Sequence, residues 1–391
     1  MLKSRTLDGA CEGQATVIRI PGSRGPGIRG DSARRRHLRP GARAGPPGPR
    51  THAASTRAGA EAVGRGAPLR GVAGRAAASP RGRVGGESHM SDAIHIERLH
   101  YRVGKAFEIK ELDLHVPTGS IYGFLGPNGS GKTTTIRLIL GLLRPLSGRI
   151  TVLGDPMPEQ HARILGRVGY VPEQPHLDAT LTVRELIAFQ AAFYPRWDRA
   201  RAEELVARFE LDGDQLFGRL SKGQKAKVMI LLALAQCGDL LVLDEPTDGL
   251  DPVVRRDILS ALITYVSERG ATIFISSHLV HELERVCDWV AVMDDGRLIT
   301  EAPMEKLKQG TKRLVVMGAP AEIVNPPFRV LTRERTNGGG AGENWVVGDW
   351  EPGMTSYFEG VGASVRDVID LDLEDGFVEL LRSFRKGGTR R

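Results

Sequence analysis

Residues 120–134 read Ser-Ile-Tyr-Gly-Phe-Leu-Gly-Pro-Asn-Gly-Ser-Gly-Lys-Thr-Thr, in which a short apolar run leads into a glycine-rich loop. From Gly126 to Thr133 the loop has the spacing G-x-x-x-x-G-K-[ST], and Thr133–Leu143 carries apolar residues at helical intervals. Glycines let a backbone wrap closely around phosphates, and the free N–H groups at the start of a helix attract an anion. The stretch therefore predicts a strand, a phosphate-binding loop and a helix in succession, an arrangement found in α/β proteins.

The loop supplies most of the groups that we expect to bind ATP. Lys132 would place its positive charge against the β- and γ-phosphates, and the hydroxyl of Thr133 would ligate Mg²⁺. The residues of this stretch that we expect to bind ATP are Gly126, Pro127, Asn128, Gly129, Ser130, Gly131, Lys132, Thr133 and Thr134.

A second motif ends an apolar strand in two acids. Leu240–Leu243 is a continuous β-type run, and Asp244 and Glu245 follow it directly. Parallel sheets bind their ligands at the carboxyl ends of the strands, where these two acids would lie. We expect Asp244 to hold Mg²⁺, directly or through water, and Glu245 to orient and polarise the attacking water as a catalytic residue.

A third motif, at 220–224, reads Leu-Ser-Lys-Gly-Gln and precedes a predicted helix over Lys225–Leu234. Ser221 and Gly223 at a helix N-terminus suit the binding of an anion, because the N–H groups there are free. Ser is also a favoured N-cap residue, so an ordinary cap is the other interpretation of this motif. Taken by itself, the motif favours the cap.

The order of the motifs is more specific than any one of them. The phosphate loop, residues 220–224, the acidic strand, Asp248-Gly-Leu-Asp251 and Ser276-Ser-His278 occur in this order. Together they resemble the nucleotide-binding domain of ABC transporters, over roughly residues 93–305. The resemblance implies that two such domains sandwich two ATP molecules. The motif at 220–224 of one subunit would then cap the γ-phosphate held by the other.

The resemblance also implies roles for single residues. Across the dimer, Ser221, Gly223 and Gln224 would bind ATP. His278 would contact the γ-phosphate and fix the attacking water together with Glu245. Asp251, which we include with the ATP-binding residues, would communicate between the subunits.

Two positions depart from the family pattern. The family usually stacks adenine on an aromatic residue after the first strand, where this chain has Val103; Tyr101 lies two residues earlier, and stacking and a plain strand role both stay open for it. Glu173 stands where the family often has Gln as a Mg²⁺ and water ligand, a place that a carboxylate also suits. This variation resembles a bacterial subgroup that includes drug- and antibiotic-export ATPases.

The 391 residues divide into three parts by composition. Residues 1–89 are rich in Arg, Gly, Ala and Pro, and we interpret them as a disordered segment or as the product of a misassigned start before Met90. Residues 90–308 form the predicted ABC-type α/β ATPase domain, with a mainly parallel sheet, an antiparallel region near its beginning and a helical subdomain at about 175–220. Residues 309–391 form a small α+β accessory domain.

Charge and composition exclude several classes of function. The first 90 residues hold 17 basic against 5 acidic side chains, whereas the remainder holds 37 basic and 42 acidic ones, so no nucleic-acid partner is expected. The three cysteines are far apart and form no Cys/His cluster, which argues against a zinc site. No apolar run is long enough for a membrane helix; the longest, Val228–Ala235, fits a buried helix.

The motifs together predict an ATP-hydrolysing subunit of an ABC transporter that powers an integral-membrane partner, for export. We expect ATP and Mg²⁺ as ligands, a second ATP-binding subunit in a homodimer or a heterodimer, and a cytoplasmic location at the inner face of the cell membrane. The aromatic stretch 189–197 would either receive the membrane partner or belong to a helix core. The alternative function is that of a soluble ABC ATPase acting on ribosomes or in DNA maintenance.

Overall fold

The predicted strand, loop and helix around the glycine-rich motif are present in the computed structural model. Strand β3 (Ile121–Leu125) leads into the loop, and helix α1 (Lys132–Ile139) begins directly after it. The helix is shorter than the sequence indicates, because Gly141 takes a φ of 67° and ends it before Leu143. The structure describes residues 92–104, 107–335 and 342–388, so the interpretation of residues 1–89 lies outside the part described.

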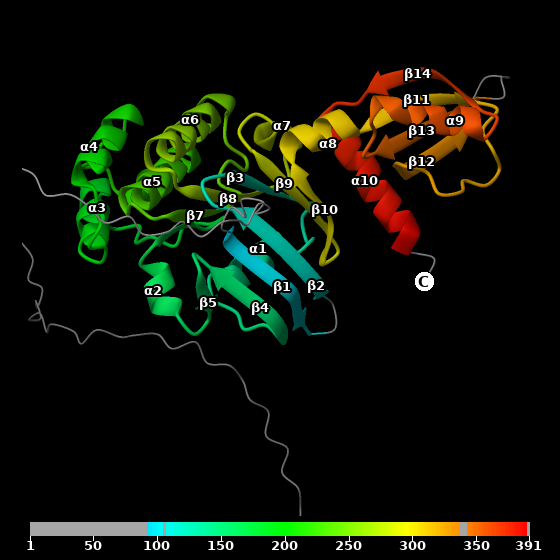
Figure 1. Cartoon of the computed structure of the whole chain (residues 1–391). Helices are drawn as coiled ribbons and strands as arrows, with labels where there is room; N and C mark the ends of the chain where they lie inside the picture. Colours follow the sequence, from blue (N-terminus) through cyan, green and yellow to red (C-terminus); the bar gives the residue numbers. More distant parts are fainter. Residues whose placement is uncertain (1–91, 105–106, 336–341, 389–391) are drawn as a thin grey trace, which may run out of the picture. The chain divides into compact units, whose positions relative to one another are not determined.

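A six-stranded sheet carries the phosphate loop at the end of β3 and the two acids at the end of β7 (Figure 1). Its order is β10-β9-β3-β8-β7-β6, and all neighbours run parallel except β10 against β9. Besides β3 it contains β6 (Val168–Val171), β7 (Leu240–Asp244), β8 (Thr272–Ser277), β9 (Trp289–Asp294) and β10 (Arg297–Pro303). Strands β3, β7 and β8 are buried along their whole length, as expected of parallel strands covered on both faces.

A second, antiparallel sheet has the order β2-β1-β4-β5. Its strands are β1 (Asp92–Val103), β2 (Phe107–Pro117), β4 (Ser147–Val152) and β5 (Asp155–Met157), and the short helix α2 (His161–Leu165) follows them. The side chains of β1 alternate, because Ile94 and Ile96 are fully buried and His95 between them is not. The antiparallel region predicted near the start of the domain is therefore present.

The helical region contains two helices where the sequence shows one long periodic stretch. These are α3 (Val183–Ala191) and α4 (Arg199–Arg208); Asp198 caps α4, since its side chain accepts from the Arg201 N–H. The turn η1 (Phe217–Arg219) and helix α5 (Lys222–Ala235) follow, and Val228–Ala235 is wholly buried. Helices α6 (Pro252–Arg269), α7 (Val280–Leu283) and α8 (Met304–Gly310) come later. Among the described residues no helix could cross a membrane.

The C-terminal part forms a third sheet, of order β12-β13-β11-β14 and antiparallel throughout. Its strands are β11 (Lys312–Met317), β12 (Arg329–Arg335), β13 (Gly342–Gly348) and β14 (Ser364–Asp370). The turn η2 (Pro352–Thr355) and helices α9 (Ser356–Gly360) and α10 (Leu373–Gly388) complete it. Trp345 and Phe358, both fully buried, centre a core of its own.

Helix α10 joins this part to the ATPase fold. Leu373 and Phe377 belong to the same apolar cluster as strands β3, β7 and β8. The guanidinium of Arg385 donates to both carboxylate oxygens of Asp294, at 2.7 and 3.2 Å. Because Asp294 is the last residue of β9, the accessory part contacts the end of a central strand.

Candidate active site

The glycine-rich loop is shaped by positions that only glycine fits without strain. Gly129 and Gly131 have φ of 82° and 115°, in the left-handed region that other residues rarely enter. A Cβ on Gly126 would overlap the carbonyl oxygen of Met293 on the neighbouring strand β9. The backbone between β3 and α1 therefore presents its N–H groups without side chains in the way.

The loop encloses the amine of Lys132. This side chain is only 6% exposed, and its Nζ donates to the carbonyl oxygen of Gly126 at 2.7 Å. The same Nζ lies 3.0 Å from Oε1 of Glu245. Nearby, the hydroxyl of Ser130 is buried and has no hydrogen-bond partner among the described residues, so a phosphate oxygen would satisfy it.

The two acids at the end of β7 face different partners. Asp244 is buried, and its Oδ1 accepts from Ser276 Oγ at 2.7 Å and from Thr133 Oγ1 at 3.2 Å. Burial raises the pKa of the Asp244 carboxyl, although both hydroxyls act against this shift. A hydroxyl beside a carboxylate is the oxygen donor set that a hard cation takes, so these two residues fit Mg²⁺.

Glu245 turns the other way. Its φ of 47° is in the left-handed region, and its N–H donates to the carbonyl oxygen of Ser276. The carboxylate lies between two basic side chains: Oε2 is 2.9 Å from Nδ1 of His278, and Oε1 contacts the Lys132 amine. The strained backbone and the two side-chain contacts fix the orientation of the carboxylate, as a general base requires.

A cavity of about 510 Å³ lies against the loop. The structure brings Lys132, Glu245 and Glu173 together at it, as the sequence analysis expects. Its lining consists of Val103, Phe107, Asn128, Gly129, Gly131, Lys132, Thr133, Thr134, Glu173 and Glu245. It combines a phosphate loop, acids for a cation and an apolar corner, which suits a nucleotide.

The apolar corner of the cavity contains Val103, as expected, but not Tyr101. Tyr101 does not line this cavity; it pairs with Ile109 and packs against the core of the antiparallel sheet. Phe107, which the sequence analysis did not select, does line it, and its Cζ would be 2.6 Å from a Cβ on Gly131. Phe107 is the cross-strand partner of Val103, so the aromatic ring comes from the opposite strand of the same hairpin.

The 220–224 motif and Asp251 do not line the same cavity. Ser221 caps α5: its hydroxyl accepts from the Gln224 N–H, and Gln224 accepts from the Ser221 N–H in return. Asp251 caps α6 by accepting from the N–H groups of two residues that follow it. Within one subunit Ser221 and Asp251 therefore act as helix caps. They could contact only an ATP molecule that is bound to another subunit.

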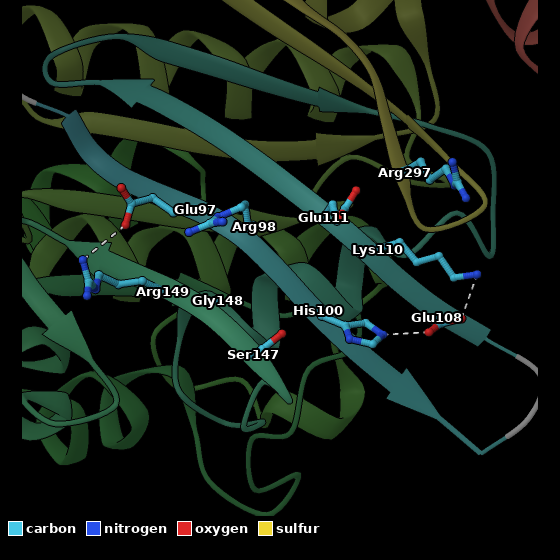
Figure 2. Close-up of a pocket in the computed structure, with 10 residues that line it drawn as sticks. All are labelled: Glu97, Arg98, His100, Glu108, Lys110, Glu111, Ser147, Gly148, Arg149 and Arg297. Carbon is cyan, nitrogen blue, oxygen red and sulfur yellow. Dashed lines mark hydrogen bonds and ion pairs between the residues drawn. The ribbon is translucent and has the colours of Figure 1, made fainter.

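A larger cavity, of about 710 Å³, lies on strands β1, β2 and β4 (Figure 2). Its charged side chains are largely paired with one another: His100 and Lys110 both contact Glu108, and Arg149 contacts Glu97. Hydrogen bonds from His100, Lys110 and Arg102 lower the pKa of Glu108 to about 2. It has neither a glycine-rich loop nor an apolar surface for a base, so it is a weaker candidate.

Comparisons with known proteins agree with this geometry. The family described as "ABC transporter" matches residues 109–248. The bacitracin transport ATP-binding protein of Bacillus licheniformis is 36% identical over 226 residues, which cover 57% of this chain and 74% of that protein. The Nod factor export ATP-binding protein I of Burkholderia orbicola is 40% identical over 215 residues, 53% of this chain and 70% of that protein.

Solved structures show the same fold. An ATP-binding subunit of an ABC transporter superposes with a TM-score of 0.51 at 27% identity, over 56% of this chain and 92% of that one. A dimeric bacterial ABC transporter cassette gives a TM-score of 0.50 at 25% identity, over 54% of this chain and 98% of that one. The fold class and the family resemblance predicted from the sequence are confirmed.

Replacing Glu245 with Gln removes the base but keeps the side chain's size. We expect ATP binding to persist and steady-state hydrolysis to fall by about 10²–10⁴-fold, the usual contribution of a general base. Nucleotide binding and phosphate release measured on the same preparation check this. Turnover at the wild-type rate would refute the role of Glu245.

Replacing Phe107 with Ala tests the base contact. Loss of one stacking surface should raise the dissociation constant for ATP by roughly tenfold, while inorganic triphosphate should bind unchanged. Tyr101→Ala is the matched control and should leave ATP affinity within about twofold of wild type, since Tyr101 lies outside the cavity. Equal losses in the two variants would contradict the assignment to Phe107.

Proposed function

Because this chain belongs to the ABC transporter family and is an ATP-hydrolysing subunit, we propose that it works as a dimer with composite sites and drives export through an integral-membrane partner. The hydrolytic step of the proposal rests on the Glu245 carboxylate, held between Lys132 and His278 beside the phosphate loop. Catalysis of phosphoryl transfer is mainly positioning and charge stabilisation, which this arrangement provides.

In the proposed mechanism the loop and Lys132 bind the β- and γ-phosphates. Thr133, Asp244 and Glu173 would hold Mg²⁺, which when bound neutralises charge on the phosphate oxygens. A phosphate beside Lys132 would compete with Glu245 for its ammonium group. The Glu245 carboxylate would then accept a proton from the attacking water, while Nδ1 of His278 keeps it in place.

The dimer is proposed because, within one subunit, most of the 220–224 motif does not reach the cavity at the phosphate loop; only Lys222 shares a neighbouring cavity with Glu173 and Glu245. The phosphate loop lines one cavity, whereas Ser221, Gly223, Gln224 and Asp251 do not reach it. In a twofold-symmetric dimer the same two surfaces meet reciprocally, so each loop would face the 220–224 motif of its partner. The relative that is itself a dimeric cassette supports this arrangement.

Two exposed aromatic rings form a surface for the membrane partner. Phe189 in α3 and Phe193 just after it are 56% and 64% exposed, and their rings lie 5.0 Å apart edge to face. They are not core residues, whereas Trp197 of the same stretch does pack against the core. We propose that this pair receives a helix of the partner at the inner face of the cell membrane.

The direction of transport is proposed from two relatives, whose names refer to bacitracin transport and to Nod factor export. The two names refer to different substrates, and no part of the described residues suggests a transport path. The substrate would therefore be selected by the membrane partner, and this chain would supply the energy.

Mixing two inactive variants tests the composite site. Lys132→Ala disables the loop, and Ser221→Asn keeps an N-cap but crowds the phosphate contact. Each variant alone should be inactive, and an equimolar mixture should regain up to about a quarter of wild-type hydrolysis, because half the dimers would hold one intact site. No recovery in a mixture shown to exchange subunits would contradict a site shared between subunits.

Affinity purification from detergent-solubilised membranes tests the partner. The Glu245→Gln chain, which should retain ATP, is expected to recover an integral-membrane protein. Changing both Phe189 and Phe193 to Ser should abolish that recovery without lowering ATP affinity, whereas Val324→Ser, at an equally exposed position, should not. Recovery of ribosomes or DNA in place of a membrane protein would support the alternative function.

A further inference from the structure

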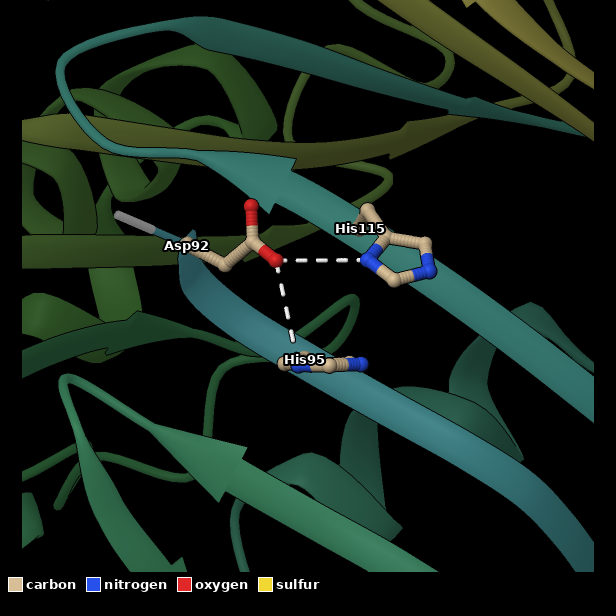
Figure 3. Close-up of side chains that lie close together, drawn as sticks. All are labelled: Asp92, His95 and His115. Carbon is tan, nitrogen blue, oxygen red and sulfur yellow. Dashed lines mark hydrogen bonds and ion pairs between the residues drawn. The ribbon is translucent and has the colours of Figure 1, made fainter. Parts of the chain in front are cut away.

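Two histidines lie directly opposite each other on the antiparallel sheet (Figure 3). His95 of β1 and His115 of β2 are cross-strand partners, and their ring centroids are 4.5 Å apart. Their neighbours along the strands, such as Ile94 and Leu114, are fully buried, so the two imidazoles occupy the other face of the sheet. They are outside the nucleotide cavity and take no part in the mechanism above.

A β-bulge brings a carboxylate to the same face. Asp92 pairs with Pro117 and Ile94 pairs with Val116, so β1 advances two residues where β2 advances one. The extra residue reverses the alternation of β1 at this point, which turns Asp92 toward the histidines. Its Oδ2 lies 3.2 Å from Nδ1 of His115 and 3.8 Å from Nδ1 of His95.

We propose that Asp92, His95 and His115 bind a divalent transition-metal ion, with Zn²⁺ the best match. One ligand atom of each residue lies within 4.8 Å of the others. Tetrahedral Zn²⁺ with bonds of about 2.0–2.1 Å places its ligands roughly 3.3 Å apart, so the ligand atoms would have to approach one another by at most about 1.5 Å. Two imidazoles and one carboxylate suit Zn²⁺, and water would complete the shell at this partly exposed place.

The surroundings constrain the His95 ring and the His115 backbone. Nε2 of His95 lies 3.9 Å from Oε1 of Glu97, too far for a hydrogen bond but near enough for the carboxylate to attract that side of the ring, so His95 can offer Nδ1 to the metal. The backbone N–H of His115 donates to Glu301, which also accepts from the buried Tyr122 hydroxyl. The β2 backbone at His115 is thus tied to the central sheet.

The metal would tie the beginning of β1 to the end of β2. The other end of the same hairpin carries Val103 and Phe107, which line the nucleotide cavity. The absence of a cysteine cluster argued against zinc from the sequence alone. A site made of two imidazoles and a carboxylate needs no cysteine, and only the strand pairing brings these three groups together.

The test is a Zn²⁺ titration of the full chain in excess Mg²⁺, which occupies the oxygen sites, with a chromophoric chelator as competitor. His95→Gln and His115→Gln should each raise the dissociation constant for Zn²⁺ by at least about tenfold, and Glu97→Gln should raise it by less, because Glu97 lies 3.9 Å from His95. The histidines of residues 1–91 are present in every variant and give the same background.

His100→Gln is the matched control, because His100 lies on the same strand but pairs with Glu108 outside the cluster. It should bind Zn²⁺ as the wild type does. Co²⁺ in place of Zn²⁺ should give the intense visible absorption of a four-coordinate site in the wild type and lose it in His115→Gln. The unfolding midpoints measured without metal show whether His95→Gln and His115→Gln fold. If both fold and still bind Zn²⁺ like the wild type, the proposal is wrong. In that case the three residues form only an ion-paired cluster.

Discussion

Glu245 has a left-handed backbone at the point where the buried strand β7 ends, and the geometry of the whole site depends on that turn. In an extended strand, successive side chains point to opposite faces. Asp244, the last residue of the strand, faces Thr133 and Ser276. The left-handed backbone of Glu245 departs from the alternation and places its carboxylate beside Lys132 and His278. The two adjacent acids therefore have different partners.

The parallel sheet supplies the rest of this arrangement. Because β8 lies between β3 and β7, its last residues contact both the loop and the acids. Ser277 accepts from the Gly126 N–H at 3.3 Å, and Ser276 holds Asp244. Behind them, the buried carboxylate of Glu282 contacts Thr247 and pairs with Arg255 at 2.7 Å, which links the segment after Glu245 to the helix after His278. This buried contact ties two loops together at the edge of the sheet.

The sequence predicts those features that depend on residues close together along the chain. The spacing within the phosphate loop and the two acids after an apolar strand are constrained by backbone geometry, so their elements were found correctly. Features set by strand pairing were missed. Phe107 reaches the cavity because it pairs with Val103 across a turn, and Asp92 joins two histidines because of a bulge. Strand β14 was also missed, since its residues are mostly exposed and show little alternation.

In the proposed dimer, one complete catalytic site needs two copies of this chain. Light scattering coupled to size exclusion, with bound nucleotide counted in the same peak, measures this directly for the Glu245→Gln variant in ATP and Mg²⁺. The account predicts a particle of twice the 42.5 kDa chain mass, carrying two ATP molecules. A particle of single mass that holds one ATP at saturation would contradict it.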